Sequence, residues 1–178
     1  MQLLTFGHGT ATLEELAALI RDAGIELVVD VRTIPRSRRH PHFWAERMRE
    51  WVPQRAGAAY EWARELGGFR SAKGPSNNPA LRHKSFRAYA DYMETPQFDA
   101  ALDAVLARAA GHHAAIMCSE SLWWRCHRRL IADAATLLHE TQVEHLAHTG
   151  KLSPHVLTDG VRVVDGLLRY DVQTSAAQ

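Results

Sequence analysis

The sequence predicts an α/β fold: an open, mainly parallel sheet flanked by helices, with a long helical insertion after the second strand and small C-terminal hairpins. Short apolar segments alternate with helical patterns throughout residues 3–148. The second apolar segment, Ile25–Val31, is almost continuously apolar, which is typical of a strand covered on both faces. A helical pattern separates it from the first, and parallel strands require such a crossover.

The first strand–helix–strand unit occupies residues 3–31. Leu3–Phe6 is an apolar run that ends at Gly7-His8-Gly9. Thr12 and Glu15 have the spacing of a capping box, and apolar residues then recur at helical intervals until Gly24 ends the pattern. These features predict a helix between two parallel strands.

Residues 32–95 are predicted as a long excursion that contains no strand. It begins with the basic loop Arg36–Arg39, continues with a helix near Phe43–Val52 and a segment rich in Gly, Pro and Asn, and ends with a helix around Lys84–Glu94. Insertions of this length often cover or form a functional site.

Two further strands are predicted in the second half. Thr95 and Pro96 begin a helix over 96–110, which leads to the third strand, Ala114–Cys118. A helix from about Trp123 to His139 follows, with Cys126, His127 and Arg128 in its opening turn. Gln142–Leu146 is the fourth parallel strand.

We expect one α/β domain over residues 1–178, with a core at 3–148, a C-terminal extension at 149–173 and a disordered tail at 174–178. Two Asp-Gly pairs, Asp159-Gly160 and Asp165-Gly166, lie among apolar residues and predict the small hairpins.

The charge balance argues against a protein-wide surface for nucleic acid, because 21 basic and 20 acidic residues give a net charge of +1. A local basic patch is still compatible with nucleic-acid binding. The sequence has neither an apolar run of about 18 residues nor the basic, apolar start of a signal peptide. We therefore expect a cytoplasmic protein without a membrane partner, whose two cysteines are free thiols.

Side chains that can react or bind charge follow the predicted strands. His8 follows the first, Asp30 and Arg32 the second, Cys118 and Glu120 the third, and His145 and His148 lie around the fourth. Ligands of open α/β sheets bind outside the carboxyl ends of the strands. We expect these groups to share one cleft.

Four residues are candidates for catalysis: Cys118, Glu120, Cys126 and His127. The helix dipole and neighbouring cationic side chains favour a thiolate at Cys126, so it is expected to be the more reactive thiol. The alternatives are that both cysteines are buried packing residues and that Glu120 only caps the helix.

Seven residues are candidates for substrate binding: His8, Asp30, Arg32, Arg36, Arg38, Arg39 and Arg128. Three guanidiniums within four residues, in a loop after a strand, suit phosphate or carboxylate recognition. The alternatives are a solvated loop, an Asp30–Arg32 ion pair that only holds the strand end, and a surface position for His8.

No metal and no cofactor are expected. The cysteines are eight residues apart, which does not fit the zinc deaminase pattern. Cys126 and His127 are adjacent and could not easily point to one metal from a helix. The only metal site that the sequence leaves open is one assembled from distant residues, such as Cys118, Cys126 and His8. The glycine patterns of phosphate and dinucleotide loops are also absent.

A series of motifs over residues 3–148 resembles the domain of unknown function 488 family. The motifs are Phe6-Gly-His-Gly-Thr10, Val29-Asp-Val-Arg32 with Pro35–Arg39, Leu66-Gly-Gly68, Phe86–Met93, and Cys118-Ser-Glu120 with Cys126-His-Arg128. The resemblance implies an α/β domain and supplies no reaction. Leu122-Trp-Trp124 stands where such proteins often carry Pro and small polar residues, so a more aromatic mouth is expected.

The leading functional hypothesis is an enzyme that binds a small or nucleotide-like anion at the strand ends and acts by covalent transfer or hydrolysis. The alternative is a nucleic-acid or protein-binding module with structural cysteines. A third reading is a site retained only for fold stability. The sequence specifies no oligomeric state.

Overall fold

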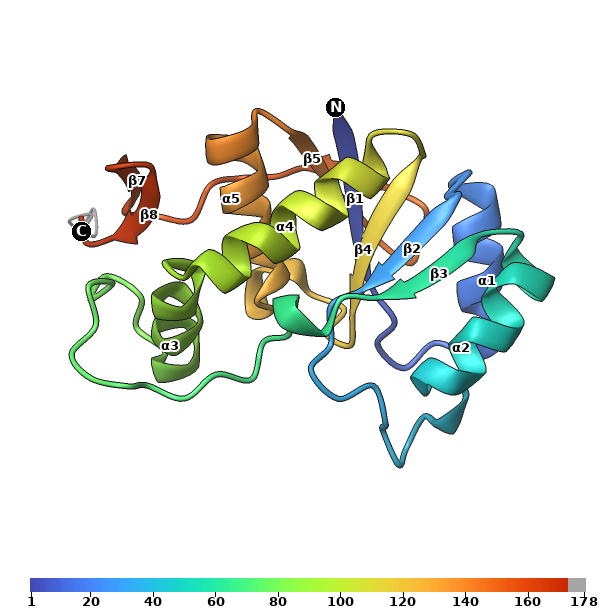
Figure 1. The fold of residues 1–178 in the computed structure, drawn as a ribbon. Coiled ribbons are helices and arrows are strands. Elements are labelled where there is room, and N and C mark those ends of the chain that lie inside the picture. The colour runs from blue at the N-terminus through green and yellow to red at the C-terminus, as the bar shows by residue number, and fades with distance from the viewer. Residues whose placement is uncertain (173–178) are drawn as a thin grey trace.

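A computed structural model describes residues 1–172 and contains a six-stranded sheet with helices on both faces (Figure 1). The strand order is β3-β2-β4-β1-β5-β6; the first five strands in the chain are parallel, and β6 runs antiparallel to β5. The predicted α/β class and mainly parallel sheet are confirmed. The strands of the sheet are β1 (Gln2–Gly7), β2 (Leu27–Asp30), β3 (Ala59–Trp62), β4 (Ala114–Cys118), β5 (Gln142–Leu146) and β6 (Leu152–Pro154).

Five α-helices form the two outer layers. They are α1 (Leu13–Asp22), α2 (Ala45–Trp51), α3 (Lys84–Met93), α4 (Pro96–Ala109) and α5 (Arg128–His139). Helices α1 and α2 share one apolar core with the sheet, and α3, α4 and α5 share the other (Figure 1). No helix in residues 1–172 is both long and apolar enough to cross a membrane.

Local sequence explains the central elements. The Thr12 side chain accepts a hydrogen bond from the Glu15 amide, and the Glu15 carboxylate accepts one from the Thr12 amide, so the predicted capping box starts α1. Strands β2 and β4 are buried along their whole length because helices cover both faces. β4 lies between β1 and β2, which brings three carboxyl ends together at the middle of one sheet edge.

The prediction of a strand-free excursion over residues 32–95 is wrong, because β3 pairs in parallel with β2 inside it. This strand has four residues, lies at the sheet edge and is only partly buried. An edge strand that buries so little apolar surface has no strong sequence pattern. The predicted helices near 43–52 and 84–94 correspond to α2 and α3, and α2 continues into a π-helical turn at Val52–Ala56.

The prediction of one helix from Trp123 to His139 is also wrong. A short 3₁₀ turn at Trp123–Arg125 ends before Cys126, whose backbone is extended, and α5 begins only at Arg128. Two other 3₁₀ turns lie in the insertion, at Pro41–Phe43 and Arg64–Leu66. The break at Cys126 decides where its side chain lies.

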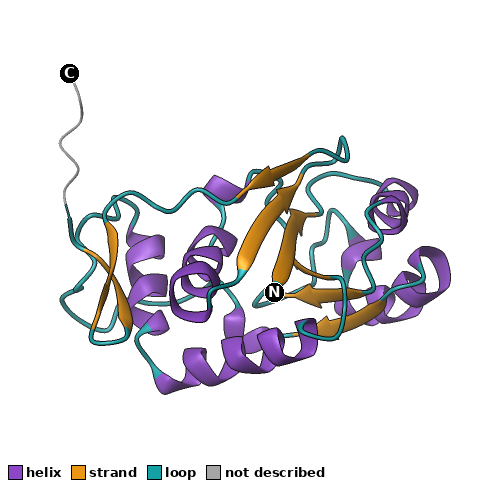
Figure 2. Cartoon of the chain, turned by 90° about the horizontal axis from the view of Figure 1, so that it is seen from above, coloured by secondary structure: helices purple, strands orange, loops and turns teal. Residues whose placement is uncertain are grey.

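Two antiparallel strand pairs occur near the C-terminus: β5 with β6, and β7 (Val161–Val164) with β8 (Leu167–Tyr170). Asp165-Gly166 joins β7 to β8 with positive φ at both residues, as the tight turn requires. Asp159-Gly160 precedes β7 instead of joining two strands. Figure 2 shows β7 and β8 at one end of the molecule, apart from the main sheet. The predicted tail, 174–178, lies outside the described residues.

Candidate functional site

A pocket of about 550 Å³ lies at the carboxyl ends of β1, β2 and β4. His8 and Gly9 reach it from the end of β1, and the loop after β2 contributes most of its residues between Arg32 and His40, but not Arg38. Cys118 enters from the end of β4. The rest of the lining comes from the segment before α5 and from the insertion, including Gly68, Phe69, Ser85 and Phe86.

The pocket contains most of the predicted site residues. Those that line it are His8, Arg32, Arg36, Arg39, Cys118, Glu120, Cys126 and His127. Those that do not are Asp30, Arg38 and Arg128, together with His145 and His148. The last two lie on the β5 side of the sheet, where His148 bonds the Gly7 carbonyl. The fourth strand end therefore does not contribute to the pocket.

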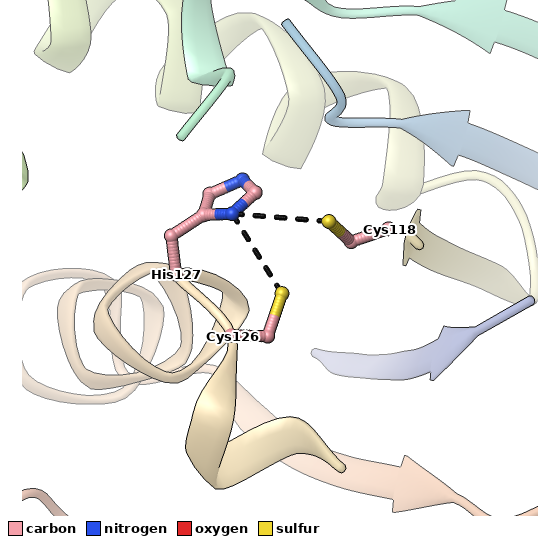
Figure 3. A group of neighbouring side chains, drawn as sticks. All are labelled: Cys118, Cys126 and His127. Atoms are coloured by element: carbon pink, nitrogen blue, oxygen red, sulfur yellow. Dashed lines mark hydrogen bonds between the residues drawn. The ribbon is translucent and has the colours of Figure 1, made fainter. Parts of the chain in front are cut away.

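The central feature of the pocket is a cluster of three side chains (Figure 3). His127 Nδ1 lies 3.8 Å from Cys118 Sγ and 3.6 Å from Cys126 Sγ. His127 Nε2 lies 3.0 Å from the Val31 carbonyl oxygen, so it carries the proton and donates to that oxygen. The other ring nitrogen, Nδ1, therefore faces both sulfurs.

The expectation that Cys126 and His127, as neighbours on a helix, could not easily point to one metal is wrong. Their ligand atoms and that of Cys118 all lie within 4.8 Å of one another. Cys126 is extended and His127 is the first residue before α5, so the two neighbours do not project from successive positions of one helix. These three residues could hold a metal ion; His8, the other ligand considered, instead faces Arg32.

The surroundings of Cys126 favour its thiolate form. Burial alone would raise its pKa, but a hydrogen bond with Cys118 and the positive charge and hydrogen bonds of Arg128 outweigh burial and lower the pKa to about 6. Arg128 Nε lies 3.5 Å from the Cys126 sulfur. This agrees with the expected order of reactivity, and the lowering comes first from the hydrogen bond with Cys118 and then from Arg128.

Cys118 stays protonated. Its hydrogen bond with Cys126, together with burial, raises the pKa of the thiol to about 12. The Cys118 S–H can therefore donate to the Cys126 thiolate. Both cysteines are buried, and neither forms a disulfide.

Arg128 is fully buried behind the cluster. It donates to Thr5 Oγ1 at 3.2 Å and to the Glu120 carbonyl oxygen at 2.5 Å, besides Cys126. It forms no salt bridge with any carboxylate in residues 1–172. Arg128 therefore contacts the Cys126 sulfur and holds the loop after β4, and it lies outside the pocket lining.

A buried hydrogen-bond chain leads to Arg128 from the opposite side, and sequence reasoning missed it. Thr5 Oγ1 bonds His145 Nδ1 at 2.7 Å, and His145 Nε2 bonds His155 Nδ1 at 3.0 Å. His155 Nε2 bonds the Asp133 carboxylate at 2.9 Å. Burial, with the nearby charges of His155 and Arg128, lowers the pKa of His145 to about 3, so its ring is neutral. Only tertiary structure brings these residues together.

Arg32 provides a fixed positive charge at the pocket. Its guanidinium forms two hydrogen bonds with the Asp30 carboxylate, at 2.8 and 2.5 Å, which confirms the proposed ion pair. Arg32 NH1 also donates to His8 Nε2 at 3.2 Å. Burial, and then the charge of Arg32, lower the pKa of His8 to about 3. His8 is thus a neutral, buried residue and not a surface histidine.

The arginines of the following loop are exposed. Arg36 pairs with Glu46 at 2.5 Å. Arg39 lines the pocket and forms no salt bridge with a residue of the described chain. Arg38, between them in sequence, lies outside the pocket lining. The Glu120 carboxylate accepts a hydrogen bond from the Leu122 amide, and the residue lines the pocket. Neither the 3₁₀ turn nor α5 has a side-chain cap, so the expected capping role of Glu120 is wrong.

Gly68 allows the insertion to reach the cluster. A Cβ at this position would lie 2.5 Å from His127 Nδ1. The Gly67-Gly68 pair is visible in the sequence as part of a family motif, but the side chain it packs against is not. Phe69 and Ile34 were also missed; both line the pocket and are 77% and 65% exposed.

The protein is an α/β domain with an open sheet. A basic pocket at the carboxyl edge of the sheet holds two free thiols and an imidazole. The chain belongs to the family described as Domain of unknown function DUF488, which matches residues 12–135 and so confirms the resemblance. The comparisons with curated proteins and with solved structures give no match.

Proposed function

We propose that this protein is an enzyme that binds a small or nucleotide-like anion in the strand-end pocket and transforms it by hydrolysis or group transfer. One observation carries the proposal: the cluster of Cys118, Cys126 and His127 shares a pocket with Arg32 and Arg39. Reactive groups and anion-binding groups are thus within reach of one ligand.

The arginines suit the recognition of phosphate or carboxylate. Arg32 is held rigidly by Asp30, whereas Arg39 is free to adjust to a ligand. The volume of about 550 Å³ falls within the roughly 300–1,000 Å³ of small-ligand pockets. The exposed Phe69 and Ile34 offer apolar contacts, which favours an anion that carries a base or another apolar group.

Cys126 is the proposed nucleophile, because its lowered pKa favours the thiolate and the residue lines the pocket. Glu120, at the same pocket, could exchange a proton with the leaving group. His8 is a poor proton carrier, since its ring is neutral at physiological pH and its Nε2 is occupied by Arg32. A reducing, cytoplasmic location would keep both thiols free.

Replacing Arg39 by Gln is expected to raise the dissociation constant of the bound anion about 10–100-fold, because a hydrogen bond to a charged group contributes about 1.5–3 kcal/mol. Calorimetric titration of chelator-treated protein with phosphate, nucleoside monophosphates and short dicarboxylates measures it. Arg38→Gln is the matched control, since Arg38 lies on the same loop outside the pocket.

Equal affinity in the wild type and Arg39→Gln, or no binding by any anion of the set, contradicts the proposal. Tight binding of an oligonucleotide with a steep salt dependence, together with weak binding of every small anion, would favour the nucleic-acid-binding alternative.

A further inference from the structure

The cluster of Cys118, Cys126 and His127 has the spacing of three corners of a tetrahedral metal site. Zinc–sulfur and zinc–nitrogen bonds of about 2.3 and 2.0–2.1 Å at tetrahedral angles place sulfur and nitrogen about 3.6 Å apart. The two sulfur–nitrogen distances here are 3.6 and 3.8 Å. A metal could therefore bind with only small movements of side chains.

The surroundings of the cluster are also those of a metal site. The Nε2–H of His127 donates to the Val31 carbonyl, which orients the ring and leaves Nδ1 as the ligand atom. Arg128 donates to the Cys126 sulfur from behind. Ligand sets of two cysteines and one histidine with an open fourth position occur at catalytic zinc.

We propose that Cys118, Cys126 and His127 bind a thiophilic divalent cation, Zn²⁺, with its fourth coordination position open to the anion pocket. All three residues line that pocket, so the open position lies on the same side as Arg32 and Arg39. Binding releases the Cys118 proton to solvent; two thiolates and a neutral imidazole then balance the charge of the cation.

This inference rests on the proposed function for the pocket and its substrate, and it changes the attacking group. With the cation bound, both sulfurs are ligands, and the metal supplies an activated water or polarises the anion. Glu120 lines the pocket and is placed to accept a proton from that water.

Titration of the chelator-treated full chain with Co²⁺ tests the site directly. We expect one Co²⁺ per chain, with the sulfur-to-cobalt charge-transfer absorption and the visible spectrum of a tetrahedral site, and displacement by one equivalent of Zn²⁺. His127→Gln is expected to weaken binding more than about 100-fold, since loss of a mere outer partner of a ligand already costs about 10–100-fold. His139→Gln, at the other end of α5, is the control and should bind as the wild type does.

Absence of the charge-transfer absorption in the wild type overturns the inference, and so does a spectrum that survives in both Cys118→Ser and Cys126→Ser. Circular dichroism shows whether each variant folds. If one does not, the wild type is tested instead: one equivalent of Zn²⁺ should protect Cys126 from alkylation. Full reactivity of Cys126 in the presence of Zn²⁺ overturns the site. Anion binding by the metal-free protein is scored separately with Arg39→Gln, so either proposal can fail while the other stands.

Discussion

At pH 7, Cys126 of the chelator-treated protein is expected to react with iodoacetamide about 100-fold faster than Cys118. The pKa values of about 6 and about 12 give a ratio of thiolate populations of about 10⁵. A less basic thiolate is a weaker nucleophile, with a Brønsted coefficient of about 0.4–0.5, which removes a factor of roughly 250–1,000. Both thiols are almost equally buried, so access does not reverse the order.

The rate at Cys126 should rise through about pH 6 and then stay level, because the thiolate is fully formed above its pKa. Mass spectrometry of the two cysteine peptides separates the sites. In Cys126→Ser, Cys118 loses the thiolate that holds its own pKa high and should react faster than in the wild type near pH 9. Faster alkylation of Cys118 than of Cys126 in the wild type would show that the charge is assigned to the wrong sulfur.

Replacing Arg128 by Met is expected to lower the free energy of unfolding by about 3–5 kcal/mol, the cost of removing one member of a buried charged pair. The side chain is fully buried, and its loss leaves Thr5 Oγ1 and the Glu120 carbonyl without a donor. Met fills much of the volume, so the loss reports on polar contacts more than on a cavity. Urea denaturation of metal-free protein measures the difference.

Arg108→Met is the matched control, because Arg108 pairs with Glu61 at the surface and 61% of its side chain is exposed. Its loss should cost no more than about 1 kcal/mol. Equal stability of Arg128→Met and the wild type would mean that Arg128 neither holds the loop after β4 nor stabilises the Cys126 thiolate.

The parts of the fold that sequence could predict are those with local causes. The Thr12–Glu15 capping box begins α1, and the apolar runs of β2 and β4 follow from burial on both faces. Because the strands are parallel, their carboxyl ends share one edge, so His8, Arg32 and Cys118 could be expected to lie in one pocket. Hydrophobic periodicity and parallel topology are therefore sufficient to predict these elements and the location of the pocket.

The parts that sequence could not predict depend on contacts between distant segments. The extended backbone at Cys126 lies beside Arg128, whose guanidinium bonds the loop after β4 and Thr5 of β1. These contacts are not visible in the sequence, where helical spacing alone predicts that Cys126 lies inside α5. Likewise, nothing local to Gly68 indicates that it packs against His127, and β3 is recognisable only by its pairing with β2.

The most direct test of the account is whether a bound anion shields the Cys126 sulfur. Alkylation of Cys126 in metal-free protein is measured with and without a saturating concentration of the tightest-binding anion of the titration set. We expect the anion to slow alkylation of the wild type and of Arg38→Gln. In Arg39→Gln, the same anion concentration should give no protection. An unchanged rate in the wild type, or equal protection in all three proteins, would contradict a shared pocket for substrate and thiolate.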